Sequence, residues 1–155
     1  MRSFLLFLAV SAAAAVPAGY SHWTQAQLDE RAKTLPARTP AKPGRVRISL
    51  EPLGGWGNHS MSLIHREGSG EAELHETESD ILFIRSGDAA IVIGGSMPGS
   101  RRTTTHELRG PKIEGGETQA LHAGDVLHIS PKTPHQIVLE PGAKLDYYAV
   151  KVAAR

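Results

Sequence analysis

Three side chains that can bind a metal ion lie close together in the stretch EAELHETESDILFIRSG. Glu73, His75 and Asp80 fall within eight residues, and the apolar run that follows them ends on a glycine. A further histidine, His135, comes sixty residues after His75, in a second cluster that begins at Gly124. Imidazole and carboxylate groups together suit a divalent transition metal, and they do not select among iron (Fe), manganese (Mn), zinc (Zn), nickel (Ni) and copper (Cu).

The spacing of these residues predicts that strands position them. Glu73 and His75 are two residues apart, and side chains at that spacing point to the same face of a strand. Asp80 opens the next expected strand, and His135 starts a later strand whose same-face partners are apolar. We therefore expect the four groups to meet at the wide end of an apolar interior. Asp80 has an alternative role, because a short carboxylate can also cap the turn that precedes it.

The remainder of the chain indicates an all-β domain. From Arg45 onward, short apolar runs are separated by turns, and the sequence contains 16 glycines and 10 prolines. We expect eight or nine short strands with no helix between them, a pattern that is typical of an antiparallel sandwich or barrel. A chain of 155 residues has room for one domain with a proper core.

The N-terminus predicts an exported protein. Residues 1–18 combine a basic residue, Arg2, with an apolar segment and a small-residue cleavage site that ends at Ala18. A membrane anchor is the alternative, although the apolar stretch is short for a bilayer span. We therefore expect a periplasmic or secreted protein with no membrane contact after the signal peptide is removed.

Residues 19–44 are expected to form a short helix and a proline-rich arm ahead of the barrel at residues 45–155. Thr24 is a plausible N-cap with Gln27 three residues later, and Leu35-Pro36 is expected to end the helix. The helix would either pack on the domain or mediate a dimer contact.

Charge and composition exclude several classes of function. Removal of the signal peptide takes away one basic residue, which leaves basic and acidic residues in balance at 16 each, so we expect no nucleic-acid partner. The absence of cysteine excludes a thiolate metal site and a cysteine nucleophile. The sequence also contains no phosphate-binding loop and no dinucleotide fingerprint.

The first cluster resembles a motif of the cupin superfamily of small β-barrels. That motif reads glycine, five residues, His-x-His, three or four residues, glutamate, six residues, glycine. Counting back from Gly87 places Asp80 at the glutamate, His75 at the second histidine and Glu73 at the first. The gap back to Gly68 is one residue short.

The second cluster resembles the second cupin motif, which reads glycine, five residues, Pro-x-Gly, two residues, histidine, three residues, asparagine. Gly124 and His135 stand at the glycine and histidine positions, and Pro131 falls one residue late. Thr133 replaces the second glycine and Leu139 replaces the asparagine.

The resemblance covers residues 46–152 and implies a cupin, or jelly-roll, antiparallel β-barrel with a short N-terminal helix. A typical metal-binding cupin has three histidines and one glutamate, whereas this chain offers Glu73, His75, Asp80 and His135. The resemblance implies a homodimer that acts on or binds a small-molecule ligand, with a metal-dependent oxygenase, isomerase or lyase as the enzymatic form. Two alternatives stay open: a metal-free barrel that binds a sugar or organic acid without catalysis, and a dimeric structural protein.

Two further residues are candidates for ligand binding. Arg109 lies in a polar, glycine-rich insertion at residues 96–119, which is longer than a minimal cupin needs. This insertion is either an exposed loop or a lid over the barrel mouth, where Arg109 would pair with a carboxylate or phosphate of the ligand. His65, on the strand before the first motif, would either line the pocket or lie on the strand surface.

Overall fold

The computed structural model describes residues 18–40 and 45–154. The predicted signal peptide lies outside the described residues except for Ala18, and so does the part of the proline-rich arm at residues 41–44. Within the described chain, no helix is long and apolar enough to cross a membrane.

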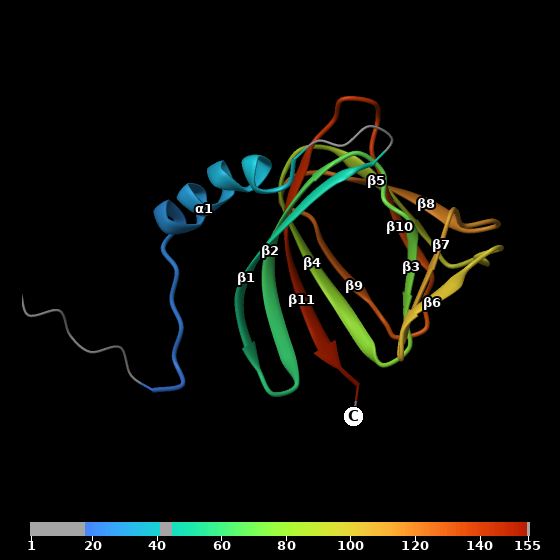
Figure 1. Ribbon diagram of the computed structural model, residues 1–155, viewed down its shortest axis with the longest axis horizontal. Coiled ribbons are helices and arrows are strands. Elements are labelled where there is room, and N and C mark those ends of the chain that lie inside the picture. Colours follow the sequence, from blue (N-terminus) through green and yellow to red (C-terminus); the bar gives the residue numbers. More distant parts are fainter. Residues whose placement is uncertain (1–17, 41–44, 155) are drawn as a thin grey trace, which may run out of the picture.

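Eleven strands of the described residues form two facing sheets (Figure 1). The first sheet contains, in spatial order, β1 (Arg47–Trp56), β2 (His59–Glu67), β11 (Leu145–Ala153), β4 (Glu78–Ser86) and β9 (Val126–Ile129). The second sheet contains β6 (Arg101–Thr104), β7 (Glu107–Gly110), β3 (Ala72–His75), β10 (His135–Val138), β5 (Ala89–Ile93) and β8 (Glu117–Leu121). Neighbouring strands are antiparallel in both sheets. The predicted all-β antiparallel jelly roll is confirmed, with two or three more strands than expected.

The space between the two sheets holds the main hydrophobic core. Alternate side chains of β4 and β11 point inward, so that Leu82, Ile84 and Tyr147 are buried there with Ile91 and Ile137 of the opposite sheet. Full burial of one such side chain contributes about 1.5–3 kcal/mol to folding. The barrel therefore has the apolar interior that the strand patterns predict.

The N-terminal helix packs on the outer face of the first sheet (Figure 1). This helix, α1 (Gln25–Arg38), begins with the predicted capping box, in which Thr24 N–H donates to Gln27 Oε1 at 2.8 Å and Gln27 N–H donates to Thr24 Oγ1 at 3.3 Å. Leu35 is fully buried and packs with Leu63 of β2. Of the two roles considered for the helix, the structure thus shows packing on its own domain.

The sequence predicted that the helix ends at Leu35-Pro36, but the helix continues to Arg38. Pro36 has no N–H to donate to the carbonyl four residues earlier, but so close to the end of the helix this omission removes a single helical hydrogen bond. Arg38 donates to Glu51 of β1 and to Thr34 Oγ1, and these bonds hold the last turn in place.

The insertion at residues 96–119 is not an irregular loop, because it contributes β6, β7 and the first residues of β8 to the second sheet. β6 and β7 form a hairpin, and β7 lies beside β3 (Figure 1). In the pairing of β7 with β3, Arg109 lies opposite Glu73. All four residues of β6 are exposed, because this strand forms the edge of the sheet. A strand whose side chains all face water needs no apolar alternation, so the sequence pattern did not reveal it.

Candidate metal centre

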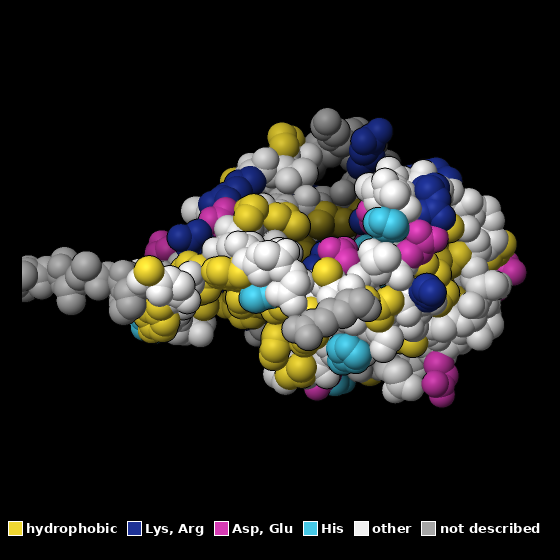
Figure 2. Space-filling view, turned by 90° about the horizontal axis from the view of Figure 1, so that it is seen from below, with side chains coloured by type: hydrophobic (Ala, Val, Ile, Leu, Met, Phe, Trp, Pro, Cys, Tyr) yellow, Lys and Arg dark blue, Asp and Glu magenta, His cyan; other side chains and the backbone are white. Residues whose placement is uncertain are grey.

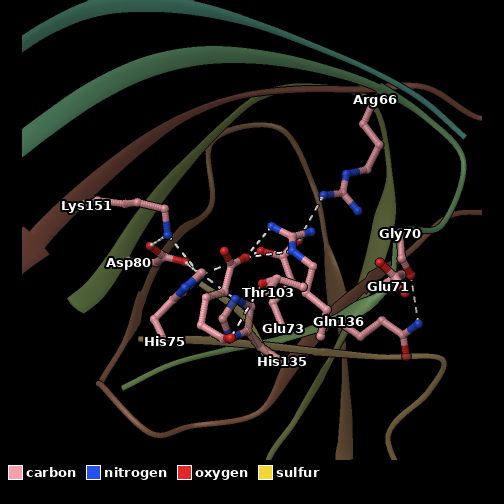
Figure 3. Close-up of polar contacts among 12 residues, drawn as sticks. Arg66, Gly70, Glu71, Glu73, His75, Asp80, Thr103, His135, Gln136 and Lys151 are labelled. Carbon is pink, nitrogen blue, oxygen red and sulfur yellow. Dashed lines mark hydrogen bonds and ion pairs between the residues drawn. The ribbon is translucent and has the colours of Figure 1, made fainter. Parts of the chain in front are cut away.

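The two sheets bring the four predicted metal ligands together (Figure 3). Glu73 and His75 come from β3, Asp80 from the start of β4 and His135 from the start of β10. His135 lies directly opposite Glu73 in the pairing of β10 with β3. His75, Asp80 and His135 are each 6 % exposed, so the cluster is shielded from bulk water.

The distances between the donor atoms suit a small metal ion. One donor atom each from Glu73, His75 and His135 lie within 4.8 Å of one another. Asp80 Oδ2 lies 3.3 Å from His75 Nε2 and 3.4 Å from His135 Nε2, and Glu73 Oε2 lies 3.6 Å from His75 Nε2. Two ligands of one ion, each about 2.1 Å from it, are separated by roughly 3.0–3.4 Å in octahedral or tetrahedral geometry. The donor groups are therefore nearly as close as a shared ion requires.

His135 is held in the tautomer that a metal needs. Its Nδ1 lies 3.0 Å from the carbonyl oxygen of Thr133, which can only accept a hydrogen bond. A ring proton therefore sits on Nδ1, which leaves Nε2, on the cluster side of the ring, as the nitrogen that could bind an ion. A hydrogen bond of this kind to a backbone carbonyl commonly orients metal-binding histidines.

Both carboxylates of the cluster are ionised at neutral pH. Burial by itself would raise the pKa of Glu73, but the neighbouring His75 and the charge of Arg109 lower that pKa to about 2. Burial also opposes the ionisation of Asp80, yet the contacts with the two histidines and with Lys151 hold its pKa below the usual range. Both carboxylates therefore carry negative charge, which neighbouring cationic side chains compensate in this structure.

A lysine competes for the same atoms. Lys151 Nζ donates to Asp80 Oδ1 at 2.8 Å and lies 2.9 Å from His75 Nε2 (Figure 3). Burial opposes the charged form of His75, but Asp80 and Glu73 raise the pKa of His75 to about 9. His75 Nε2 can accept from Lys151 or donate to Asp80, but it cannot do both. A proton, the ammonium group of Lys151 and a metal ion would thus all use the same lone pair, that of His75 Nε2.

Arg109 lines the cavity, but protein carboxylates already occupy its guanidinium. Its Nη1 donates to Glu73 Oε1 at 3.0 Å, and its Nε donates to Glu107 Oε1 at 2.7 Å. Arg109 therefore orients a candidate metal ligand. Its predicted contact with an anionic small molecule stays a prediction.

The cluster borders a cavity of about 180 Å³ between the two sheets. Apolar side chains form much of its wall, among them Ile48, Ile64, Leu82 and Ile137. Figure 2 shows acidic and basic side chains next to hydrophobic ones in a hollow of the surface. Because an apolar cavity of about 150 Å³ can hold benzene, this space suits a molecule of a similar small size.

Comparisons with known proteins identify the fold. No protein-family profile and no curated protein matches the sequence. The structure of KdgF from Halomonas sp. matches with a TM-score of 0.50 and 18% identity, over 75% of this chain and 86% of that one. A Klebsiella pneumoniae protein with a double-stranded β-helix domain matches with a TM-score of 0.52 and 15% identity, over 78% and 88%. The fold is that of the cupins.

A third structural match is a predicted oxalate decarboxylase from Thermotoga maritima, with a TM-score of 0.51. Its sequence is 17% identical, and the match covers 68% of this chain and 80% of that one. At such identities the likeness shows the fold alone, so the chemistry must be argued from this chain's own residues.

The glycine from which the first cupin motif was counted has a structural reason. Gly87 has a φ of 89°, and a Cβ at this position would collide with the carbonyl oxygen of Lys144. Only glycine adopts this turn without strain. The count back to Asp80, His75 and Glu73 therefore starts from a position that the barrel restricts to one residue type.

The side chain of His65 does not line the cavity between the two sheets, which corrects the prediction that it lines the pocket. Its neighbours Ile64 and Arg66 line the cavity, and alternation along β2 therefore turns His65 to the outer face. There its Nδ1 lies 2.7 Å from Asp146 Oδ1 and its Nε2 lies 3.1 Å from Glu67 Oε1. A ligand-binding role does not fit a ring whose nitrogens both contact protein carboxylates outside the cavity.

Sequence reasoning did not single out Lys151 or Arg66, which both line the cupin cavity. Lys151 follows Tyr147 and Ala149 on the inward face of β11, and Arg66 follows Ile64 on the inward face of β2. In β11 the signal was a charged residue at the end of an inward-facing apolar series, and in β2 it was a charged residue two positions after the inward-facing Ile64. Such a residue has to find a partner inside the barrel.

Proposed function

We propose that this chain is an exported cupin that holds one divalent transition metal in its barrel and acts on or binds a small organic molecule there. Glu73, His75 and His135 would hold the metal, with Asp80 as a fourth ligand when Lys151 withdraws. The observation that carries the proposal is the convergence of these imidazole and carboxylate donors within 4.8 Å.

The donor set suits a metal with open coordination positions. Two histidines and one carboxylate on one side of an ion are the ligands of non-haem iron oxygenases. When bound, such a metal polarises a substrate oxygen or activates water or oxygen. The chain's own residues would orient the ligands: Thr133 fixes the tautomer of His135, and Arg109 holds Glu73.

The position and lining of the cavity support the proposal that the substrate is a small organic molecule. It borders the cluster directly, since Glu73, Asp80 and His135 line it together with apolar side chains. Two of the structural neighbours, an oxalate oxidase and a predicted oxalate decarboxylase, are named for reactions of a small organic acid. An enzyme of the oxygenase, isomerase or lyase type is the form of activity that we propose.

A metal-free binding module is a second candidate, and one observation favours it. The ammonium group of Lys151 lies 2.8 Å from Asp80 Oδ1 and 2.9 Å from His75 Nε2. In this position the ammonium group supplies, next to Asp80 and His75, the positive charge that a metal ion would otherwise provide. In this alternative the barrel binds a small molecule and catalyses no reaction.

The proposal includes a periplasmic or secreted location and a homodimer. The location rests on the charged, apolar and small-residue pattern of residues 1–18. The homodimer rests on the resemblance to the cupins. Light scattering of the chain without residues 1–18 tests the dimer, and a monomeric mass would contradict it.

Elemental analysis tests the metal site. The chain is purified without metal-affinity steps and compared with His75→Ala and His135→Ala. We expect about one ion per chain in the wild type and at least about a tenfold loss in both variants, because each removes an imidazole ligand. His122→Ala serves as the control, because His122 is exposed and bonds Asp88 outside the cluster.

The metal-free alternative makes the opposite prediction. A wild-type chain with far less than one ion, and with no thermal shift on addition of Fe, Mn, Zn, Ni or Cu, would reject the metal centre. Equal metal loss in His122→Ala would show that the ions bind surface histidines.

A further inference from the structure

A buried arginine extends from β2 into the cavity. Arg66 is 4 % exposed, and its Nη2 donates to the hydroxyl of Tyr147 at 3.4 Å. Its Nε and Nη1 have no hydrogen-bond partner among the residues that the structure describes. Figure 3 shows that Arg66 and Lys151 approach the cluster around Glu73 from different sides.

The positive charge of Arg66 is only partly compensated by the protein. The carboxylate oxygen nearest to it in an ion pair, Glu73 Oε1, lies 3.9 Å away and also accepts from Arg109 at 3.0 Å. One oxygen thus serves two guanidinium groups, and the closer one is Arg109. A buried cation with unpaired N–H groups favours an additional anion beside it.

The absence of a side chain at position 70 leaves room for the guanidinium of Arg66. It lies against Gly70, where a Cβ would overlap Nη1. On another side lies Tyr147, which is 4 % exposed and shares the cavity wall. The Tyr147 hydroxyl accepts from Arg66 and so retains its own proton to donate, and burial raises the pKa of Tyr147, which keeps that proton in place.

We propose that Arg66 and Tyr147 form a carboxylate-binding site, and that the ligand is a small, mostly apolar organic acid. Arginine recognises carboxylates through paired N–H donors, and a phenol adds a third donor. The apolar wall around Ile64 and Ile137 would contact the hydrocarbon part of the acid. A cavity of about 180 Å³ leaves room for a hydrocarbon part no larger than a benzene ring. This inference deepens the proposed function and rests on it, since the same cavity borders the metal cluster.

Matched acids and amides test the site directly. Isothermal titration calorimetry at fixed ionic strength compares butanoate with butanamide and benzoate with benzamide, on the chain both before and after loading with Zn²⁺. We expect each acid to bind at least about tenfold more tightly than its amide, because only the acid pairs with the guanidinium charge. Arg66→Gln is expected to abolish this preference.

Arg102→Gln is the matched control, because it removes the same charge from an exposed arginine that pairs with Glu76. It is expected to keep the full preference for acids. Equal affinity for acids and amides in the wild type, no binding of any of the four probes, or an unchanged preference in Arg66→Gln would each overturn the proposal.

A second variant keeps the test decisive if Arg66→Gln does not fold, as judged by circular dichroism. Tyr147→Phe removes only the hydroxyl and is expected to weaken acid binding about fivefold with little change for amides. Unchanged acid binding in Tyr147→Phe would then overturn the site.

Metal content measured in the same samples separates this inference from the metal centre. A preference for acids in a chain that takes up no metal on loading supports the carboxylate site and rejects the metal centre. Bound metal without that preference supports the metal centre and overturns the carboxylate site.

Discussion

Two clusters in this protein have nearly the same composition, but one lies between the two sheets and the other lies on the outer face of the first sheet. In the inner cluster, His75 lies between Glu73 and Asp80, at 3.6 and 3.3 Å. In the outer cluster, His65 lies between Glu67 and Asp146, at 3.1 and 2.7 Å. Both histidines are buried. Residue types alone therefore do not distinguish a candidate site from a structural contact.

In the outer cluster, the histidine and the carboxylates are already paired with protein side chains. Asp146 accepts a hydrogen bond from Ser86, and Arg85 lies 3.7 Å from Asp146 while also pairing with Asp29 of α1. Each ring nitrogen of His65 contacts a different carboxylate. This cluster links three strands to the helix.

The inner cluster differs because two of its atoms are shared between partners, and one of them, His75 Nε2, cannot satisfy both. Two arginines approach Glu73 Oε1, and Lys151 and Asp80 both approach His75 Nε2. A second histidine and a cavity adjoin it. Competition for the same atoms beside a cavity indicates a place where a ligand can change the pairing.

Among substitutions in the two clusters, the largest effect on a measured free energy is expected in the outer cluster. His65→Ala should lower the free energy of unfolding by about 1–3 kcal/mol, because it leaves two partly buried carboxylates without their shared partner. Urea unfolding measures this change, and elemental analysis should find the same metal content as in the wild type. Loss of metal with unchanged stability would show that the outer cluster takes part in the site.

A smaller effect is expected when the competing charge is removed from the inner cluster. Lys151→Met should tighten metal binding by about tenfold, or about 1.4 kcal/mol, because Asp80 and His75 no longer lose the ammonium contact when the ion binds. Titration against a chelator of known affinity measures it. Lys144→Met is the control, because Lys144 is exposed and pairs with Glu67 outside the cavity. An unchanged affinity for the metal ion in Lys151→Met would show that Lys151 does not compete with the ion.

The smallest effect concerns the helix next to the outer cluster. The hydrogen bond from Arg38 holds the pKa of Glu51 below its usual value, although partial burial opposes this, and Arg31 contributes further. The stabilisation is therefore complete above the unfolded pKa of Glu51 and is lost as the pH falls through the folded pKa. Glu51→Gln should cost up to about 1 kcal/mol at pH 7, as measured by urea unfolding. The difference from wild type should shrink as the pH is lowered from about 5 towards 3. A constant difference across this range would contradict the assignment.

The parts of the site that sequence predicts are those that depend on local alternation. Glu73 and His75 share a strand face because they are two residues apart. The same alternation predicts an antiparallel sandwich or barrel, and the resemblance to the cupins selects the barrel and gives Asp80 and His135 their motif positions. These predictions need no knowledge of how distant strands align.

The parts that sequence did not predict depend on the alignment of distant strands. Lys151 meets Asp80 across 71 residues, because β11 pairs with β4 in the register that sets these two residues opposite each other. That register shifts at Asp146, where the pairing is irregular. Arg66 reaches its partner Tyr147 across 81 residues in the same way. A one-residue slip would turn either side chain to the other face.

Gly70 has a consequence for the history of this cavity. A side chain at position 70 would occupy the space of the Arg66 guanidinium, which would have to move because it is the far end of a flexible side chain. A descendant that acquires alanine at position 70 would keep its arginine but hold the guanidinium in another place. With the carboxylate site that we propose, such a barrel would change its preference among acids without losing the positive charge.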